Sequence, residues 1–148
     1  MDRLNSWLTL IANIGVLGGF LFLAYEIQQN TAQLRAEASY SINEALSSLN
    51  SAEYSDQAFA DVLNRGEQDL DSLDPAEARQ FFMFQFDRIN LALHISELEK
   101  DGLHDVHFPY REFLIQDFHR KPGLQQFLEA VGETYIGDRT LYNELLRD

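Results

Sequence analysis

The chain has 148 residues, which is enough for one domain and a short additional segment but too few for two domains of ordinary size. It carries 24 acidic and 11 basic residues, and the formal charge of -13 opposes binding to nucleic-acid phosphates and to anionic lipid headgroups. The absence of cysteine excludes disulfides and thiolate metal sites but is compatible with either side of a membrane.

The first predicted element is an apolar segment close to the N-terminus. Between Trp7 and Tyr25 the only strongly polar residues are Thr9 and Asn13, so the run has the length of about 20 residues that a helix needs to cross a bilayer. Trp7 and Tyr25 stand near its two ends, where aromatic rings favour the headgroup region. We therefore predict a transmembrane helix.

Two other interpretations of this segment remain open. A cleaved signal peptide would fit its position and Arg3, although Asp2, the length of the apolar run and the lack of a small-x-small cleavage site argue against cleavage. A buried helix of a soluble protein would need partners that cover every face of the helix.

Small residues inside the predicted span indicate association between helices. Gly15 and Gly19 form a G-x-x-x-G pair with Ala12 on the adjoining surface, and this spacing lets two helix backbones approach closely in lipid. Asn13 adds an amide that needs a hydrogen-bonding partner in hydrocarbon, for which a second copy of the chain is a candidate. These four residues are the predicted oligomer interface, although glycine is common in membrane helices generally.

A polar stripe along the same helix suggests an alternative role. Successive residues turn by about 100° around a helix, which brings Asn5, Thr9 and Asn13 to one side. Several copies with this stripe turned inward could line a narrow pore. Because the stripe carries no charge, we favour hydrogen bonding between helices and keep the pore as the alternative.

The helix is expected to continue beyond the membrane, since no proline or glycine occurs from Phe20 to Arg65. Apolar residues recur there at steps of three and four and form a face that must pack on later helices or on a neighbouring copy: Leu34, Ala38, Ile42, Ala45 and Leu49. We divide the chain into a transmembrane anchor, residues 1–30, and a helical bundle domain, residues 31–148.

Start and stop signals mark the next helices. A second helix is predicted over residues 56–64, with Arg65-Gly66 as its stop. The acidic run 69–74 lacks the glycine turn and the spacing of a calcium-binding loop. Asp74-Pro75-Ala76-Glu77 instead combines the N-cap, proline and glutamate that begin a helix.

A long central helix is predicted from Pro75 to about Lys100. Its large apolar residues cover more than one face, as is typical of the central helix of a bundle: Phe81, Phe82, Phe84, Phe86, Ile89, Leu93 and Ile95. Such a cluster could line a lipid or cofactor pocket, but packing is its commoner role. Asp87 and Arg88 interrupt the cluster and are expected to pair with other helices.

Histidines supply the remaining candidates for chemistry. His104, Asp105 and His107 lie in a predicted loop between Gly102 and Pro109 and could offer three ligands to a divalent metal. Their spacing matches no zinc signature, so we favour solvated loop histidines. The sequence also lacks a nucleophile elbow, a glycine-rich phosphate loop and a sustained basic patch.

Three shorter helices complete the chain, over residues 110–118, 123–135 and 138–146. We find no alternating strand pattern, repeat or low-complexity linker. The predicted fold is all-α, with an N-terminal transmembrane helix that continues into a small helical bundle.

Several short motifs, taken in order, resemble those of a widespread family of small uncharacterised bacterial single-pass membrane proteins. They extend over nearly the whole chain and are Glu26-Ile27-Gln28-Gln29-Asn30-Thr31, Arg65-Gly66, Asp71-Ser72-Leu73-Asp74-Pro75-Ala76-Glu77, Gly102-Leu103 and Pro122-Gly123. The resemblance implies a bacterial inner-membrane location and supplies no catalytic residue. Arg3 and Arg35 nearly balance across the span, so the side of the membrane stays open, with the cytoplasmic side favoured for the domain.

The sequence favours a non-enzymatic function. We expect a membrane-anchored, self-associating scaffold or accessory subunit that uses no cofactor and no metal. Its expected partners are the lipid bilayer, its own copies and an unidentified membrane protein, and not nucleic acid. The alternative is a homo-oligomeric channel or pore lined by the N-terminal helices, and the third hypothesis is an enzyme or metal sensor that uses His104, Asp105 and His107.

Overall fold

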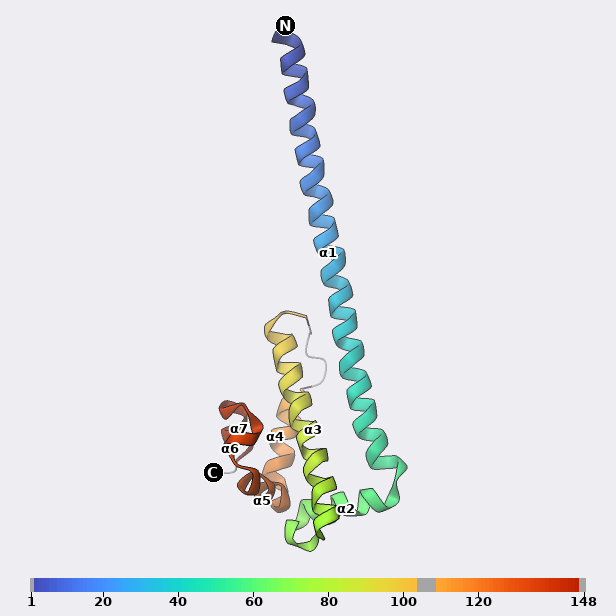
Figure 1. Ribbon diagram of the computed structural model, residues 1–148, viewed down its shortest axis with the longest axis vertical. Coiled ribbons are helices and arrows are strands. Elements are labelled where there is room, and N and C mark those ends of the chain that lie inside the picture. The colour runs from blue at the N-terminus through green and yellow to red at the C-terminus, as the bar shows by residue number, and fades with distance from the viewer. Residues whose placement is uncertain (1, 104–108, 147–148) are drawn as a thin grey trace. The chain divides into compact units, whose positions relative to one another are not determined.

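The computed structural model describes residues 2–103 and 109–146, with side chains from residue 5 onward (Figure 1). Within these ranges every regular element is helical, which confirms the predicted all-α fold. The elements are α1 (Asp2–Ser55), α2 (Gln57–Gln68), the 3₁₀ turn η1 (Leu70–Ser72), α3 (Pro75–Lys100), α4 (Tyr110–Arg120), α5 (Pro122–Val131), α6 (Glu133–Ile136) and α7 (Arg139–Leu145). Contacts divide the chain into a first unit, residues 1–38, and a second unit, residues 39–148.

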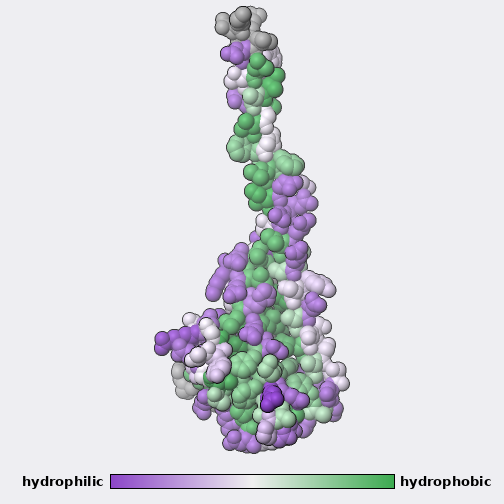
Figure 2. Space-filling view, viewed as in Figure 1, coloured by the Kyte–Doolittle hydropathy of each residue, from purple (hydrophilic) through white to green (hydrophobic). Residues whose placement is uncertain are grey.

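The first unit consists of the N-terminal part of α1. This helix is long and apolar enough to cross a membrane, and none of its most apolar window is buried within the fold. In Figure 2 green hydrophobic side chains extend along the helix below the grey N-terminal residues, with purple and white patches along one edge. A helix satisfies its own backbone hydrogen bonds, so such a segment suits lipid. Because α1 has no break before Ser55, the predicted continuation of the apolar helix is confirmed.

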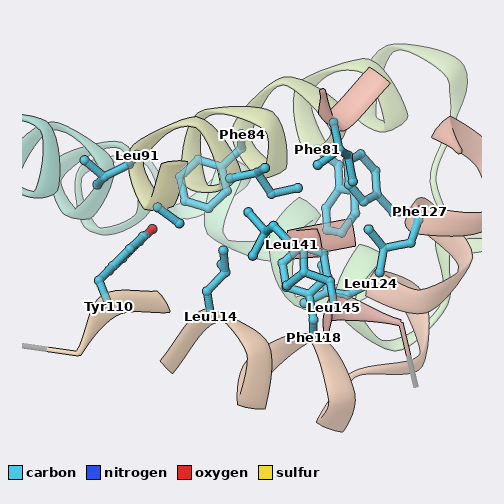
Figure 3. Close-up of a cluster of buried hydrophobic side chains, with 14 of the residues drawn as sticks. Phe81, Phe84, Leu91, Tyr110, Leu114, Phe118, Leu124, Phe127, Leu141 and Leu145 are labelled. Atoms are coloured by element: carbon cyan, nitrogen blue, oxygen red, sulfur yellow. The ribbon is translucent and has the colours of Figure 1, made fainter. Parts of the chain in front are cut away.

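The second unit is a helical bundle in which α3 contacts α2 and α4, and α5 contacts α2 and α4. The short helices α6 and α7 pack against α5, and α7 also contacts α4. Figure 3 shows part of the core, whose largest fully buried apolar side chains are Phe81, Ile89, Leu114, Phe118, Leu124, Phe127, Leu128, Leu141 and Leu145. Burying one large apolar side chain contributes about 1.5–3 kcal/mol, so these residues dominate the stability of the unit.

Phe127 of α5 is central to the aromatic packing. Its ring meets those of Phe82, Phe86 and Phe118 edge to face, with ring centroids 5.0, 5.4 and 6.3 Å away. This geometry adds about 0.5–1.5 kcal/mol per pair to the contribution of burial. The phenylalanines of α3 therefore form a packed core, as the sequence predicts.

Acidic side chains begin three of the helices. The Asp74 carboxylate accepts hydrogen bonds from the backbone N–H groups of Ala76 and Glu77, and the Glu77 carboxylate accepts one from the N–H of Asp74. This reciprocal capping box starts α3, which has the predicted bounds. Asp56 caps α2 and Asp138 caps α7 by the same chemistry.

The predicted end of the second helix at residue 64 is wrong. Helix α2 continues through Gly66 to Gln68, because Gly66 serves close packing and not a helix stop. A Cβ on Gly123, near the start of α5, would lie 1.8 Å from the Gly66 carbonyl oxygen, and a Cβ on Gly66 would lie 2.6 Å from the Phe81 ring. The two helices therefore approach at a pair of glycines where no larger side chain fits.

The predicted helix over residues 123–135 is also wrong. Helix α5 ends at Val131, and Gly132, which separates it from α6, has a φ of 69°. Gly137 ends α6 with a φ of 74°, and both values lie in the left-handed region that glycine occupies without strain. Helix α4, in contrast, runs on to Arg120, past its predicted end at residue 118.

Candidate functional site

Asn5, Thr9 and Asn13 line one shallow groove on α1, together with Ser6 and Leu10. The Thr9 hydroxyl donates to the carbonyl oxygen of Asn5 at 2.9 Å, so it is satisfied within its own helix. The side-chain amide of Asn13 forms no hydrogen bond to any other described residue. Asn13 therefore keeps its full hydrogen-bonding capacity for a group outside the helix.

Gly15 and Gly19 leave an open surface on another side of α1. A Cβ at either position would meet nothing within 4 Å. The two glycines are four residues apart and share one side of the helix, with Ala12 beside them. Asn13 precedes Gly15 by two residues, which turns it away by about 200°. One contact between two helices can therefore include the glycine pair or Asn13, but not both.

These two surfaces of α1 are suited to association and not to reaction chemistry. Between Trp7 and Tyr25 the sequence contains no Asp, Glu, Lys, Arg or His. Neither surface can therefore transfer a proton or offer the ionisable ligands on which most metal sites depend. What the surfaces offer is close backbone approach at the glycines and amide hydrogen bonding at Asn13.

A largely buried ion-pair network lies in the second unit. The Arg88 guanidinium donates hydrogen bonds to the Asp117 carboxylate at 2.5 Å and to the Gln85 side-chain oxygen at 2.9 Å. The Lys121 ammonium lies 2.8 Å from the other Asp117 oxygen and 2.8 Å from the Glu67 carboxylate. Asp117 thus bridges two cations and joins α3 to the C-terminal end of α4.

Burial and pairing together set the ionisation of this network. Burial disfavours the charged form of Asp117, but the hydrogen bond from Lys121 and the charge of Arg88 outweigh it, so the pKa of Asp117 lies below its ordinary value. Burial raises the pKa of Tyr110, which extends from α4 toward α3 in Figure 3. The predicted pairing of Arg88 is confirmed, whereas Asp87 forms no ion pair within the described ranges.

Arg65 joins α2 to the start of α3. Its guanidinium lies 2.6 Å from the Glu77 carboxylate and 2.9 Å from the Asp61 carboxylate, and it donates to the carbonyl oxygen of Ser72 at 3.1 Å. The hydrogen bond from Arg65 lowers the pKa of Glu77 below its usual value. Two of the motifs that carry the family resemblance, Arg65-Gly66 and the segment that ends at Glu77, are therefore joined by a structural contact.

The residues of the metal hypothesis lie outside the described part of the chain. His104, Asp105 and His107 belong to residues 104–108, which the structure does not describe. In the described remainder, no group of three or more His, Asp or Glu side chains is placed to hold a metal ion. In the acidic run 69–74, the carboxylates of Asp69 and Asp74 accept hydrogen bonds from backbone N–H groups at helix starts, which agrees with the structural interpretation.

Sequence reasoning missed a cavity in the second unit. It has a volume of about 540 Å³ and is lined by residues of α1, α2, α3 and α4 and by Lys121, among them Glu53, Arg88 and Tyr110. Its walls come from segments far apart in the sequence, so no local motif reveals it.

No family model, curated protein or solved structure matches the chain.

Proposed function

We propose that the protein is a membrane-anchored scaffold or accessory subunit that self-associates through α1. The observation that carries this proposal is the apolar surface of α1 between Trp7 and Tyr25, none of which the fold buries. In water such a surface would drive aggregation, whereas in hydrocarbon it is in its favourable environment. The second unit, in contrast, buries most of its large apolar residues in its own core, and its exposed large apolar or aromatic side chains are Tyr40, Tyr54, Met83, Phe113 and Tyr135.

Self-association follows from the two surfaces of α1. The pair Gly15 and Gly19 permits close backbone packing, and the Asn13 amide can bond to the same amide of another copy. Hydrogen bonds between membrane helices contribute about 0.6–2 kcal/mol each. Because the two surfaces point in different directions, one helix can contact two neighbours, which permits assemblies larger than a dimer.

Light scattering of the full chain in detergent tests self-association. We expect a protein mass above that of one copy, and a decrease in mass for Gly15→Ile and Gly19→Ile, because branched side chains hold the backbones apart. Leu21→Ile is the control, since it places a β-branched side chain on a side of the helix about 120° from Gly15 and about 80° from Asn13, away from both surfaces. A monomeric parent protein, or equal masses for all variants, contradicts the proposal.

The groove that contains Asn5, Thr9 and Asn13 supports a homo-oligomeric pore as the second candidate function. Turned inward, it would offer an uncharged polar lining in which the amides of Asn5 and Asn13 face the permeating species, because the Thr9 hydroxyl bonds to its own helix. Vesicles that contain the protein should then conduct ions, and Asn13→Leu should change that flux. Electrically silent vesicles with verified oligomers exclude the pore.

We further propose a bacterial inner-membrane location with the second unit in the cytoplasm, based on the apolar span and the family resemblance. The chain has no cysteine, so single introduced cysteines report the topology cleanly. A membrane-impermeant maleimide should label Ser48→Cys only after lysis and Asp2→Cys in intact spheroplasts. The reverse pattern would place the second unit on the opposite side.

A further inference from the structure

The cavity of about 540 Å³ in the second unit is a feature that the proposed function does not use. Its volume falls within the range of about 300–1,000 Å³ that is typical of small-molecule sites. Ionisable groups and aromatic rings line it, together with two leucines and three side-chain amides. Their arrangement identifies the chemical class of ligand that fits.

The ionisable groups leave one negative charge without a partner. The two cations of the lining, Arg88 and Lys121, each lie within 2.8 Å of a carboxylate, and Asp117 bridges both of them. Glu67 completes the pairing of Lys121. The lining carboxylate of Glu53, in contrast, has no hydrogen bond or ion pair to any residue that the structure describes.

The aromatic side chains form a wall and a rim. Phe84 and Tyr110 are 8 and 6% exposed and belong to the inner wall. Tyr54 and Phe113 are 81 and 49% exposed, although both also line the cavity. Aromatic rings attract cations, and clusters of aromatic side chains are a common means of recognising organic ammonium ions.

We propose that this cavity binds a small organic cation with a single positive charge and an apolar body. Glu53 balances the charge, and the aromatic side chains contact the apolar body of the ligand. An anion is disfavoured because both lining cations are already engaged and the chain carries a charge of -13. A bare divalent metal is disfavoured because it needs several oxygen ligands at once, and the lining offers one unpaired carboxylate.

Calorimetry with benzyltrimethylammonium, performed on the full chain in a non-ionic detergent, tests this inference. We expect saturable binding that weakens as salt is added, and much weaker binding of the neutral probe benzyl alcohol and the anionic probe benzoate. Glu53→Gln should raise the Kd by about tenfold or more, because it removes the only unpaired charge of the lining. Tyr54→Ala, at an exposed position, should raise the Kd by a smaller factor.

Glu44→Gln is the matched control, since Glu44 is an exposed carboxylate on the same helix and does not line the cavity. It should leave the Kd unchanged, and the melting profile of each variant shows whether its fold is intact. Three results would each overturn the inference: no binding of the ammonium probe, equal or tighter binding of benzoate, or an unchanged Kd in correctly folded Glu53→Gln. None of these results bears on membrane anchoring, so the two proposals stand or fall separately.

Discussion

The two units of the chain place their apolar side chains in opposite environments. In the first unit Leu17 and Phe20 are 62 and 66% exposed, whereas in the second unit Phe81 and Phe127 are fully buried. Both units are helical, so secondary structure does not distinguish them. The difference shows that the stability of the second unit arises from its own packing, whereas the state of the first unit depends on what surrounds it.

The largest expected effect comes from a substitution that disrupts the packing of the second unit and leaves the first unit unchanged. Gly123→Ala places a Cβ 1.8 Å from the Gly66 carbonyl oxygen, and backbone on both sides leaves little room to move. We expect the free energy of unfolding to fall by about 4 kcal/mol or more, measured by denaturation of the full chain in detergent. Gly18→Ala is the control, because a Cβ there meets nothing within 4 Å. Equal loss in both variants would show that glycine packing does not distinguish the units.

The next effect concerns the charged network of the second unit. Asp117→Asn leaves Arg88 without its carboxylate, and breaking a buried pair by removing one partner costs about 3–5 kcal/mol. The effect should also depend on pH. Because the folded pKa of Asp117 is depressed, its contribution is complete above the ordinary carboxyl pKa and is lost as the pH falls through the folded pKa. As the pH falls below about 4 the stabilities of the two proteins should therefore begin to converge; parallel profiles would contradict this account.

The third expected effect comes from a substitution that weakens membrane insertion of the first unit and leaves the second unit unchanged. Leu17→Arg puts a charge into the middle of the apolar span, which costs about 2.5–3.5 kcal/mol for membrane insertion. We expect less protein in the carbonate-resistant membrane fraction. Tyr40→Arg, on an exposed surface of the second unit, should leave that fraction unchanged. Undiminished recovery of Leu17→Arg in membranes would mean that lipid does not surround this segment.

The smallest effect removes one helix cap. Asp74→Ala eliminates the acceptor for two backbone N–H groups at the start of α3 and should cost about 1 kcal/mol. Asp71→Ala is the nearby control, because the structure gives its carboxylate no capping contact. Thermal denaturation of the two variants measures the difference. Identical midpoints would show that the Asp74 cap does not stabilise α3.

The sequence predicts elements whose signals are local. The start of α3 follows from Asp74 to Glu77, because cap and helix lie within four residues. The passage of α2 through Gly66 is not predictable in this way, since it depends on a contact with Gly123 from a different helix. The break at Gly132 did have a local signal, namely a glycine within an apolar pattern. The predicted helix was nevertheless continued through this glycine.

The same distinction between local signals and tertiary contacts applies to the candidate site. The angle between Asn13 and the glycine pair follows from the helical period alone, so their separation onto two sides of α1 could be obtained from the sequence. The cavity beside Glu53 could not, because it depends on how four helices pack. Arg88 was expected to pair, but only the fold identifies Asp117 as its partner.

The Glu77 carboxylate serves two helices at once, as the second half of the capping box of α3 and as the partner of Arg65 at the end of α2. Its depressed pKa keeps it ionised in acid that would neutralise an ordinary glutamate. When the pH falls through that lower pKa, a single protonation of Glu77 weakens both its ion pair with Arg65 and its hydrogen bond from the Asp74 N–H, which together stabilise the corner, that is, the connection between α2 and α3. The amides on either side of this corner should therefore become accessible to solvent exchange together, as one local opening unit.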